Sequence, residues 1–400
     1  MNDSKKITLI SHNDSNGGAA RAVNRLFKCL ISNNNQVKLM LMKKSDNRNE
    51  IVEVNFFKRI FGHILSRLDI KICNFLIPKS REWKTGAFFG VLSARNINKS
   101  DADAINLHWL GHGLISLRQL RKIKKPIIWT LHDEWALQPI THYSDGVVTI
   151  KRSNLLQKYI SKFIIWNRTK QKSNFILNEN VNLVALNNEM KSRLVLTYPE
   201  KINKIFRIPN PVDLAIFNPS NRNYFAESLN LARDKSTLLF LGGTCDIRKG
   251  WDLLENSLQF TKSSFNLIVI GGKDRKIISS DREINIVGIE VISNLHDLID
   301  LYIASSAVIV PSRAEGLPQT ATESISCGTP VIGFKIGGLI DIVINEKTGY
   351  VVEPFNIQEL GLAIDKSISA GKDVFKNNCR SFAEKEFACG VVSSKYNSII

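Results

Sequence analysis

Two glutamates, Glu315 and Glu323, stand eight residues apart in one segment of the chain. The apolar run 307–310 before them predicts a strand, with Glu315 on the loop after it and Glu323 in the first turns of the next helix. Ligands of α/β proteins bind at the carboxyl ends of parallel strands, so both carboxylates are expected near that edge of a sheet. The backbone N–H groups of Gln319 and Thr320, at the start of the helix, are placed to bind a phosphate.

Two neighbouring cations, Arg248 and Lys249, follow another predicted strand at 236–241 and the glycines 242–243. Arginine offers a bidentate pair of donors and lysine a mobile point charge, so together they can neutralise a diphosphate without a metal. The alternative interpretation of this pair is ordinary solvated surface charge.

A glycine pair, Gly17–Gly18, lies between a predicted strand at 7–11 and a predicted helix at 19–31. Small residues there let a phosphate or a polar sugar approach the N–H groups at the positive end of the helix. A tight loop without a ligand is the commoner explanation of such a pair, and the spacing does not match the dinucleotide-binding G-x-G-x-x-G pattern.

The elements that must position these residues alternate between strand and helix, which predicts α/β domains with parallel sheets. A chain of 400 residues that is 44% hydrophobic is too apolar to be disordered and too long for one core. The prolines 209 and 211 predict a linker, with one domain at 1–210 and the next at 211–381; an ordinary loop is the alternative. Strands are expected at 7–11, 37–42, 104–107, 127–131 and 183–186, then at 236–241, 265–270, 284–287, 307–310 and 330–334, and a helix at 114–124.

Charge is distributed unevenly, because Lys and Arg minus Asp and Glu gives 35 − 15 = +20 before residue 211 and 19 − 22 = −3 after it. Nucleic acid and an anionic membrane surface both attract such a basic half. No apolar run approaches the roughly 20 residues of a membrane-spanning helix, and the first run is too short for a signal peptide, so the protein is expected in the cytoplasm.

A basic amphipathic pattern covers segment 56–89, where Phe56, Phe57, Ile60, Phe61 and Ile64 recur at helical spacing among Lys and Arg residues. Such a helix is suited to lying in a lipid interface. A helix that packs its apolar face into the core is the alternative, and periodicity does not separate the two.

The segment with the two glutamates resembles the retaining nucleotide-sugar glycosyltransferases of family 4, whose signature is Glu, seven residues, Glu. The likeness continues through the stretches 208–213, 328–334, 337–338, 341–343 and 348–350. The amino-terminal half resembles a bacterial capsule and O-antigen branch of that family, through 16–21, 107–109 and 129–135.

This resemblance implies a GT-B architecture, in which two Rossmann-like domains face one another across a cleft. The first domain would bind the acceptor and the second the donor, while a helix within 382–400 crosses back to the first domain. Many members carry an arginine where this chain has Gly243, and Arg248 is expected to supply that charge.

The resemblance also implies roles for single residues. Glu315 would act at the donor sugar near the transferring carbon, and His132 beside the reacting centre, whereas His108 and His112 are expected to be structural or to line the acceptor site. Glu323 would bind the ribose hydroxyls, and Arg248 with Lys249 the diphosphate. The nucleotide-sugar site would comprise Gly17, Gly18, Arg248, Lys249, Gly316, Gln319, Thr320 and Glu323.

The expected function is therefore retaining transfer, of the hexosyltransferase type, from a nucleotide-diphosphate sugar. The acceptor would be a glycan or a polyprenyl-diphosphate-linked sugar in O-antigen (lipopolysaccharide) or capsule synthesis. The enzyme would be peripheral on the inner face of the cytoplasmic membrane. An anionic membrane surface is expected as a partner, and nucleic acid is not. The six cysteines form no C-x-x-C pair, and neither a cofactor nor a metal is expected. A sugar-nucleotide epimerase of the same architecture and a non-catalytic membrane-surface protein are the alternatives.

Overall fold

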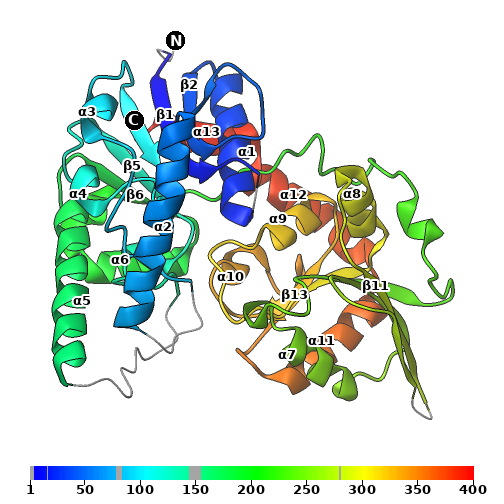
Figure 1. Ribbon diagram of the computed structural model, residues 1–400. Helices are drawn as coiled ribbons and strands as arrows, with labels where there is room; N and C mark the ends of the chain where they lie inside the picture. The colour runs from blue at the N-terminus through cyan, green and yellow to red at the C-terminus, as the bar shows by residue number, and fades with distance from the viewer. Residues whose placement is uncertain (1–3, 16, 78–82, 144–154, 279–280) are drawn as a thin grey trace. The chain divides into compact units, whose positions relative to one another are not determined.

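The computed structural model describes residues 4–15, 17–77, 83–143, 155–278 and 281–400. Two compact units make up the chain, one of residues up to Pro211 together with Val392–Ile400, and one of Val212–Val391. Each unit is a mainly parallel sheet covered by helices (Figure 1). The predicted α/β class with two Rossmann-like domains is confirmed.

The sheet of the first unit has seven strands within the described residues, in the order β3-β2-β1-β4-β5-β6-β7, and all its pairs are parallel. The five predicted strands are confirmed, and the two that the sequence did not predict, β3 and β7, have only three residues each. The strands are β1 (Lys6–Asn13), β2 (Gln36–Lys43), β3 (Ile51–Glu53), β4 (Ala104–Leu107), β5 (Ile127–Leu131), β6 (Val181–Ala185) and β7 (Ile205–Arg207).

The helices of this unit include two long ones, α2 (Phe56–Leu76) and α5 (Leu155–Ile176). The predicted helix at 114–124 is wrong in extent, because only α4 (Leu117–Leu120) is helical. Ser116 caps that helix by accepting a hydrogen bond from the Gln119 N–H, so Leu114 and Ile115 enter the core as non-helical residues. The others are α1 (Gly18–Ser32), α3 (Ala94–Asn98), α6 (Asn188–Thr197) and the last helix of the chain, α13 (Cys389–Asn397).

The carboxyl-terminal helix α13 completes the core of the first unit. Its Val392 and Tyr396 are buried in the same cluster as Phe27 of α1, and the Tyr396 hydroxyl lies 2.9 Å from the Thr130 hydroxyl. The sequence placed the start of this returning segment at 382, whereas residues 382–387 belong to α12 (Asp373–Phe387) and the units divide at 391.

The sheet of the second unit has the order β10-β11-β9-β8-β12-β13-β14, and only β10 is antiparallel to its neighbour among the described strands. The five predicted strands are confirmed. The strands are β8 (Ser236–Leu241), β9 (Phe265–Ile270), β10 (Arg275–Ile278), β11 (Glu283–Ile289), β12 (Ala307–Val310), β13 (Val331–Phe334) and β14 (Gly349–Val352). The helices besides α12 are α7 (Trp251–Ser257), α8 (Leu295–Ala304), α9 (Gln319–Ser326), α10 (Leu339–Ile342) and α11 (Ile357–Ala370).

The order of strands reverses once in each sheet. The first sheet grows from β1 to β3 on one side and from β4 to β7 on the other. The second grows outward from β8, through β9, β11 and β10 on one side and from β12 to β14 on the other. Ligands of open α/β sheets bind beyond the carboxyl ends of the strands at such a reversal. A site is therefore expected beyond β1 and β4 in the first unit, and beyond β8 and β12 in the second.

Candidate active site

The loop after β12 holds Glu315 with one carboxylate oxygen surrounded by donors. Oε1 accepts hydrogen bonds from Lys249 Nζ at 2.7 Å and Ser312 Oγ at 2.8 Å, and Arg248 Nη1 lies 3.3 Å away. The side chain is only 7% exposed. Because all three donors meet Oε1, the carboxylate is held in one orientation, and Oε2 remains as an acceptor for a further donor.

A short 3₁₀ helix after β8, Ile247–Lys249, brings the two cations to this carboxylate. Asp246 caps it by accepting the Arg248 N–H. The next residue, Gly250, has φ +72°, and a Cβ there would lie 1.9 Å from the Pro311 carbonyl oxygen. The Arg313 N–H also donates to the Arg248 carbonyl at 2.8 Å. Backbone contacts thus fix the loop after β8 against the loop after β12.

The loop after β13 supports Glu315 from the other side. A Cβ at Gly337, where φ is +51°, would lie 1.8 Å from the Glu315 carbonyl oxygen. The Gly338 N–H donates to the Gly316 carbonyl at 2.9 Å. Glycine is therefore required at 337 for the backbone to approach so closely.

Burial and charge oppose each other at Glu315. Burial would raise the pKa of its carboxyl, but the charges of Lys249 and then Arg248, with hydrogen bonds from Lys249 and Ser312, lower that pKa below its usual value. The group is therefore a carboxylate at neutral pH.

The second glutamate has different surroundings. Glu323 lies on α9, is buried, and accepts a hydrogen bond from the Tyr302 hydroxyl of α8 through Oε2 at 2.9 Å. Gln319, also buried, and Thr320 form the first turn of the same helix. The two glutamates thus hold different places at this edge, one beside cations and one beside a phenol.

Sequence reasoning missed several residues of this edge. Ser312 follows β12 three residues before Glu315, a spacing that could have suggested its contact. Arg313 pairs through both terminal nitrogens with Asp252, at 2.7 and 2.6 Å. Its charge is thereby balanced, which leaves Lys249 and Arg248 as the cations on Glu315.

In the first unit, His132 lies just after β5. Its Nε2 is 3.0 Å from Nδ1 of His108, which follows β4. Burial lowers the pKa of His132 to about 4, although the neighbouring Asp133 raises it in part. Asp133 itself pairs with Nδ1 of His142 at 2.6 Å. His132 is therefore a neutral imidazole at pH 7, suited to hydrogen-bond a sugar hydroxyl.

Aromatic rings gather where β1 and β4 end. Trp109 stacks on His112 with ring centres 4.7 Å apart, and His12 meets both rings edge-on. Burial lowers the pKa values of His12 and His112 to about 4. His112 has φ +55°, a conformation that non-glycine residues adopt at a cost. His12 was not predicted, although its place at the reversal of strand order could have indicated it.

Gly17 and Gly18 open α1, next along the chain from β1. Both are exposed, and Gly17 has φ +88° with no atom within 4 Å of the position of a Cβ. The space beside the Gly17 Cα would therefore admit a ligand atom. It lies in the same unit as His132, whereas Arg248, Lys249, Gly316, Gln319, Thr320 and both glutamates lie in the other.

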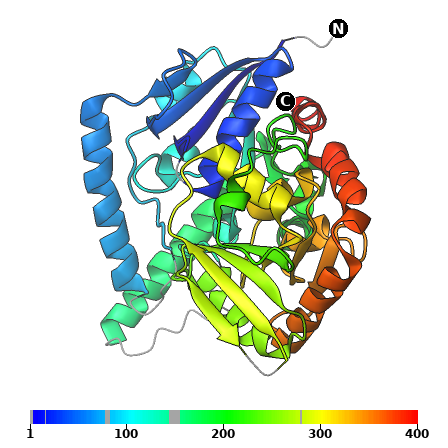
Figure 2. The ribbon, with the colours of Figure 1, turned by 90° about the vertical axis from the view of Figure 1, so that its right-hand side faces the viewer.

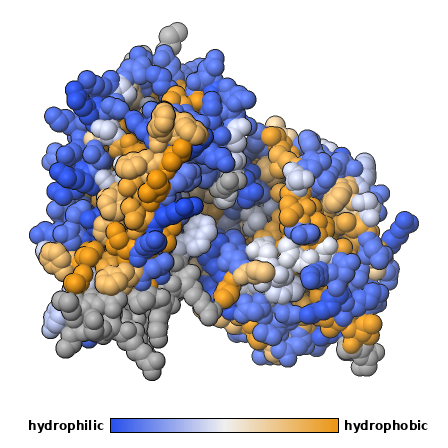
Figure 3. Space-filling model, in the orientation of Figure 1, coloured by the Kyte–Doolittle hydropathy of each residue, from blue (hydrophilic) through white to orange (hydrophobic). Residues whose placement is uncertain are grey.

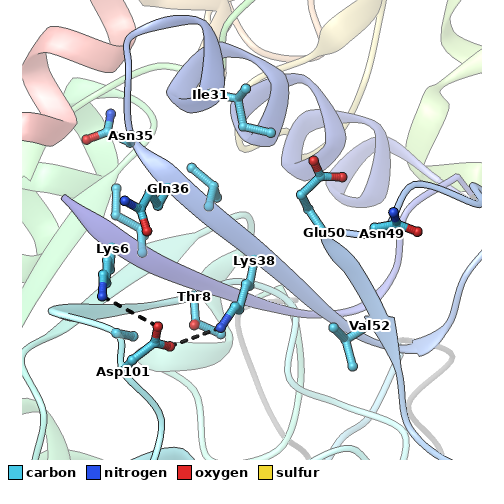
Figure 4. A pocket seen from close by; sticks show the side chains of 13 residues that line it. Lys6, Thr8, Ile31, Asn35, Gln36, Lys38, Asn49, Glu50, Val52 and Asp101 are labelled. Atoms are coloured by element: carbon cyan, nitrogen blue, oxygen red, sulfur yellow. Dashed lines mark hydrogen bonds and ion pairs between the residues drawn. The ribbon is translucent and has the colours of Figure 1, made fainter. Parts of the chain in front are cut away.

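A hollow of the first unit lies at the opposite end of its strands (Figure 4). Lys6 and Lys38 line it, and both pair with Asp101, at 3.7 and 3.0 Å. It contains none of the predicted site residues.

Two features are absent from the described parts of the chain. No helix there has the length and apolarity to cross a bilayer. Nor do those parts gather three or more His, Cys, Asp or Glu side chains that could hold a metal ion.

Comparisons with known proteins place the chain among glycosyltransferases. A D-inositol 3-phosphate glycosyltransferase of Xylanimonas cellulosilytica is 30% identical over 187 residues, which are 43% of this chain and 44% of that protein. The match thus spans about half the length of such curated relatives.

Two solved structures show the same fold over the whole chain. Sucrose-phosphate synthase of Thermosynechococcus elongatus is 20% identical, with a TM-score of 0.66 over 99% of this chain and 98% of that one. Anabaena Alr3699/HepE in complex with UDP-glucose is 14% identical, with a TM-score of 0.63 over 98% of both.

Family models match both units. Residues 222–385 match Glycosyl transferases group 1. Residues 16–216, half of the 400-residue chain, match Glycosyltransferase Family 4. With the GT-B fold and an ordered carboxylate among cations at the reversal point of the second sheet, these matches show that the chain belongs to glycosyltransferase family 4.

Proposed function

We propose that this protein transfers a sugar from a nucleoside-diphosphate donor to a glycan or lipid-linked acceptor, with retention of configuration and without a metal. The observation that carries the proposal is the Glu315 carboxylate held by Lys249, Arg248 and Ser312 at the reversal point of the second sheet. Since Anabaena HepE was solved with UDP-glucose, UDP-sugars are the first donors to test.

In the proposed reaction the bond between the sugar carbon and the diphosphate oxygen breaks, and a bond to the acceptor oxygen forms on the same face. The departing phosphate oxygen takes the acceptor proton, so no general base of the protein is required. Lys249 and Arg248 stabilise the negative charge that develops on the leaving group. Glu315 orients these cations through Oε1, and Oε2 accepts a hydrogen bond from the donor sugar.

The acceptor side of the proposal rests on the first unit. The neutral His132 would hydrogen-bond the sugar near the reacting carbon. Gly17 and Gly18, predicted as part of the nucleotide-sugar site, would let a phosphate approach the start of α1. A lipid-linked acceptor at the inner face of the cytoplasmic membrane explains the +20 charge of residues 1–210 better than a free sugar does. We therefore place the reaction in the synthesis of a bacterial surface polysaccharide such as O-antigen or capsule.

The orientation of α2 supports membrane association. Gly62, Ser66 and Asp69 face the unit, and the Asp69 carboxylate accepts the N–H groups of Gly86 and Phe88 at 2.8 Å. Phe57 is 80% exposed, and Figure 3 shows the apolar face of α2 as a stripe on the surface. Up to Asp69 the buried residues of α2 are Gly62, Ser66 and Asp69, so the large apolar side chains of that part do not pack into the core, whereas Cys73 and Leu76 are buried near its end. Lys84, a basic residue of segment 56–89, is buried, and its Nζ donates a hydrogen bond to the Ile77 carbonyl oxygen.

The experiment is a thermal-shift screen of UDP-, GDP- and ADP-sugars, followed by a transfer or hydrolysis assay with the donor that raises Tm. Lys249→Ala should lower the rate by about 10² to 10³ while the protein still unfolds cooperatively. Lys335→Ala is the matched control, since Lys335 pairs with Glu353 on the surface of the same unit.

Three results would contradict the proposal. Interconversion of a free nucleotide sugar without transfer would indicate an epimerase. Absence of both transfer and hydrolysis with every donor would indicate a non-catalytic protein of the same fold. Equal activity of Lys249→Ala and Lys335→Ala would show that the site lies elsewhere.

A further inference from the structure

The first half of α5 has the same inverted orientation as α2. Among residues 158–163 only Ser161 is buried, while Phe163 is 62% and Trp166 is 55% exposed. Tyr159 and Ile160 are exposed beside them. The second half instead buries large side chains, among them Lys172, Phe175 and Ile176. In the first half of α5, large apolar side chains thus point to solvent while a small polar side chain packs inward. Exposed apolar patches of this kind are typical of interaction sites.

These side chains form one continuous face of the helix. Positions 159, 163, 166 and 170 follow helical spacing. The rings of Phe163 and Trp166 lie 6.0 Å apart, and Lys170 Nζ lies 5.0 Å above the Trp166 ring. Aromatic rings with lysines beside them are typical of side chains at a membrane–water interface.

Charge favours an anionic partner for both long helices. α5 contains no acidic residue, and its Lys158, Lys162 and Lys170 are exposed. The one acidic residue of α2, Asp69, is buried. A second copy of this chain would bring like charges together on such a face, which opposes dimerisation through it.

The two helices are joined where α2 ends. Ile72 of α2 and Ile164 and Ile165 of α5 pack against one buried cluster, which contains Cys73 and Leu76. Figure 2 shows α2 and α5 along the outside of the first unit, meeting at one end. Both helices therefore pack within the same compact unit, so two weak contacts made to one surface would reinforce each other.

We propose that residues 158–170 of α5 form a second membrane-binding face, which together with the apolar face of α2 docks the first unit on an anionic lipid surface. The inference deepens the proposed function by assigning a partner to α5. Binding to lipid needs no catalysis, so its test is independent of the proposed transfer.

The test is sedimentation of the full chain with vesicles of 70% phosphatidylcholine and 30% phosphatidylglycerol, compared with phosphatidylcholine alone. Phe163→Ser/Trp166→Ser should weaken binding to anionic vesicles about tenfold or more, as should Phe57→Ser/Phe61→Ser. Leu196→Ser/Ile202→Ser is the matched control, because both side chains are exposed in the same unit but belong to other elements, α6 and the 3₁₀ helix Pro199–Lys204. It should bind like the parent.

A spectroscopic measurement keeps the test independent of folding defects. Trp166→Phe preserves an apolar ring, so binding should persist, while the quenching of tryptophan fluorescence by brominated lipid should fall. Parental binding by Phe163→Ser/Trp166→Ser, or unchanged quenching in Trp166→Phe, overturns the assignment of α5. The assignment is also overturned if the parent binds no vesicles and self-associates, while Phe163→Ser/Trp166→Ser does not self-associate. That result would identify a second copy of the chain as the partner of α5.

Discussion

Glu315→Gln should separate affinity for the donor diphosphate from transfer. The amide keeps the shape of the side chain and can still accept the hydrogen bonds of Ser312 and Lys249, but it removes the negative charge. Lys249, paired with the carboxylate in the free protein, then carries uncompensated charge, while Arg248 keeps its pairing with Asp246 at 3.3 Å. An anionic nucleotide should therefore bind more tightly, while the sugar loses the charged acceptor Oε2.

The structure sets the size of this effect. Lys249 Nζ is 2.7 Å from Oε1, so a phosphate oxygen about 2.8 Å from Nζ lies within about 5.5 Å of the carboxylate. At an effective dielectric constant of about 20, repulsion between two unit charges at that distance is about 3 kcal/mol. Water in the open site reduces it, and we expect about half of that value, a roughly tenfold lower Kd.

The assay is calorimetric titration of the parent and of Glu315→Gln with the nucleoside diphosphate of the preferred donor, beside a transfer assay. We expect tighter nucleotide binding and a transfer rate reduced by about 10² or more. Weaker nucleotide binding would show that Glu315 supports the cations more than it competes for them. Transfer at the parental rate would remove Glu315 from the reaction.

Four further outcomes follow from the same site. Ser312→Ala frees the carboxylate to rotate, so kcat should fall about tenfold with little change in donor KM, and Ser312→Thr should restore it; an equal change in both constants would contradict the positioning role. Glu323→Ala should raise donor KM with kcat nearly kept, since we propose that it binds the ribose; a selective loss of kcat would contradict this. Transfer should persist in excess EDTA, because two cations are available for the diphosphate, and a strict Mg²⁺ or Mn²⁺ requirement would refute it. Because the pKa of Glu315 is lowered, its ionic stabilisation is full above the ordinary glutamate pKa and is lost as pH falls through the pKa of the folded protein. The difference in Tm between the parent and Glu315→Gln should therefore be constant near neutral pH and shrink in acid. The same difference in Tm at every pH would contradict the assignment.

The central strands and the separate motifs that contain Lys249 and Glu315 could be predicted because their signals are local. Runs such as 236–241 and 307–310 are continuously apolar, as buried parallel strands must be. The contact of Lys249 with Glu315 was not predicted, because it depends on β8 and β12 being neighbours in the sheet. β10 could not be predicted in this way, since as an exposed edge strand, Arg275–Ile278, it lacks an apolar pattern.

Other features depend on tertiary contacts that periodicity does not encode. The spacing of Phe57 and Phe61 defines a helix face, but only the contacts of Asp69 with Gly86 and Phe88 show that the opposite face is the packed one. In α5 the buried side changes partway along the helix, so no single face is apolar throughout. The histidine cluster needed the strand order, since His12 and His112 are a hundred residues apart.

The return of α13 to the first unit has a consequence for synthesis of the protein. On the ribosome, residues up to 211 emerge long before Val392 and Tyr396, which fill the core beside Phe27. The first unit cannot close its core until Tyr396 has been synthesised, whereas residues 212–391 form a continuous unit that can mature earlier. A nonsense mutation at codon 392 would therefore damage the domain encoded at the start of the gene and spare the one next to it.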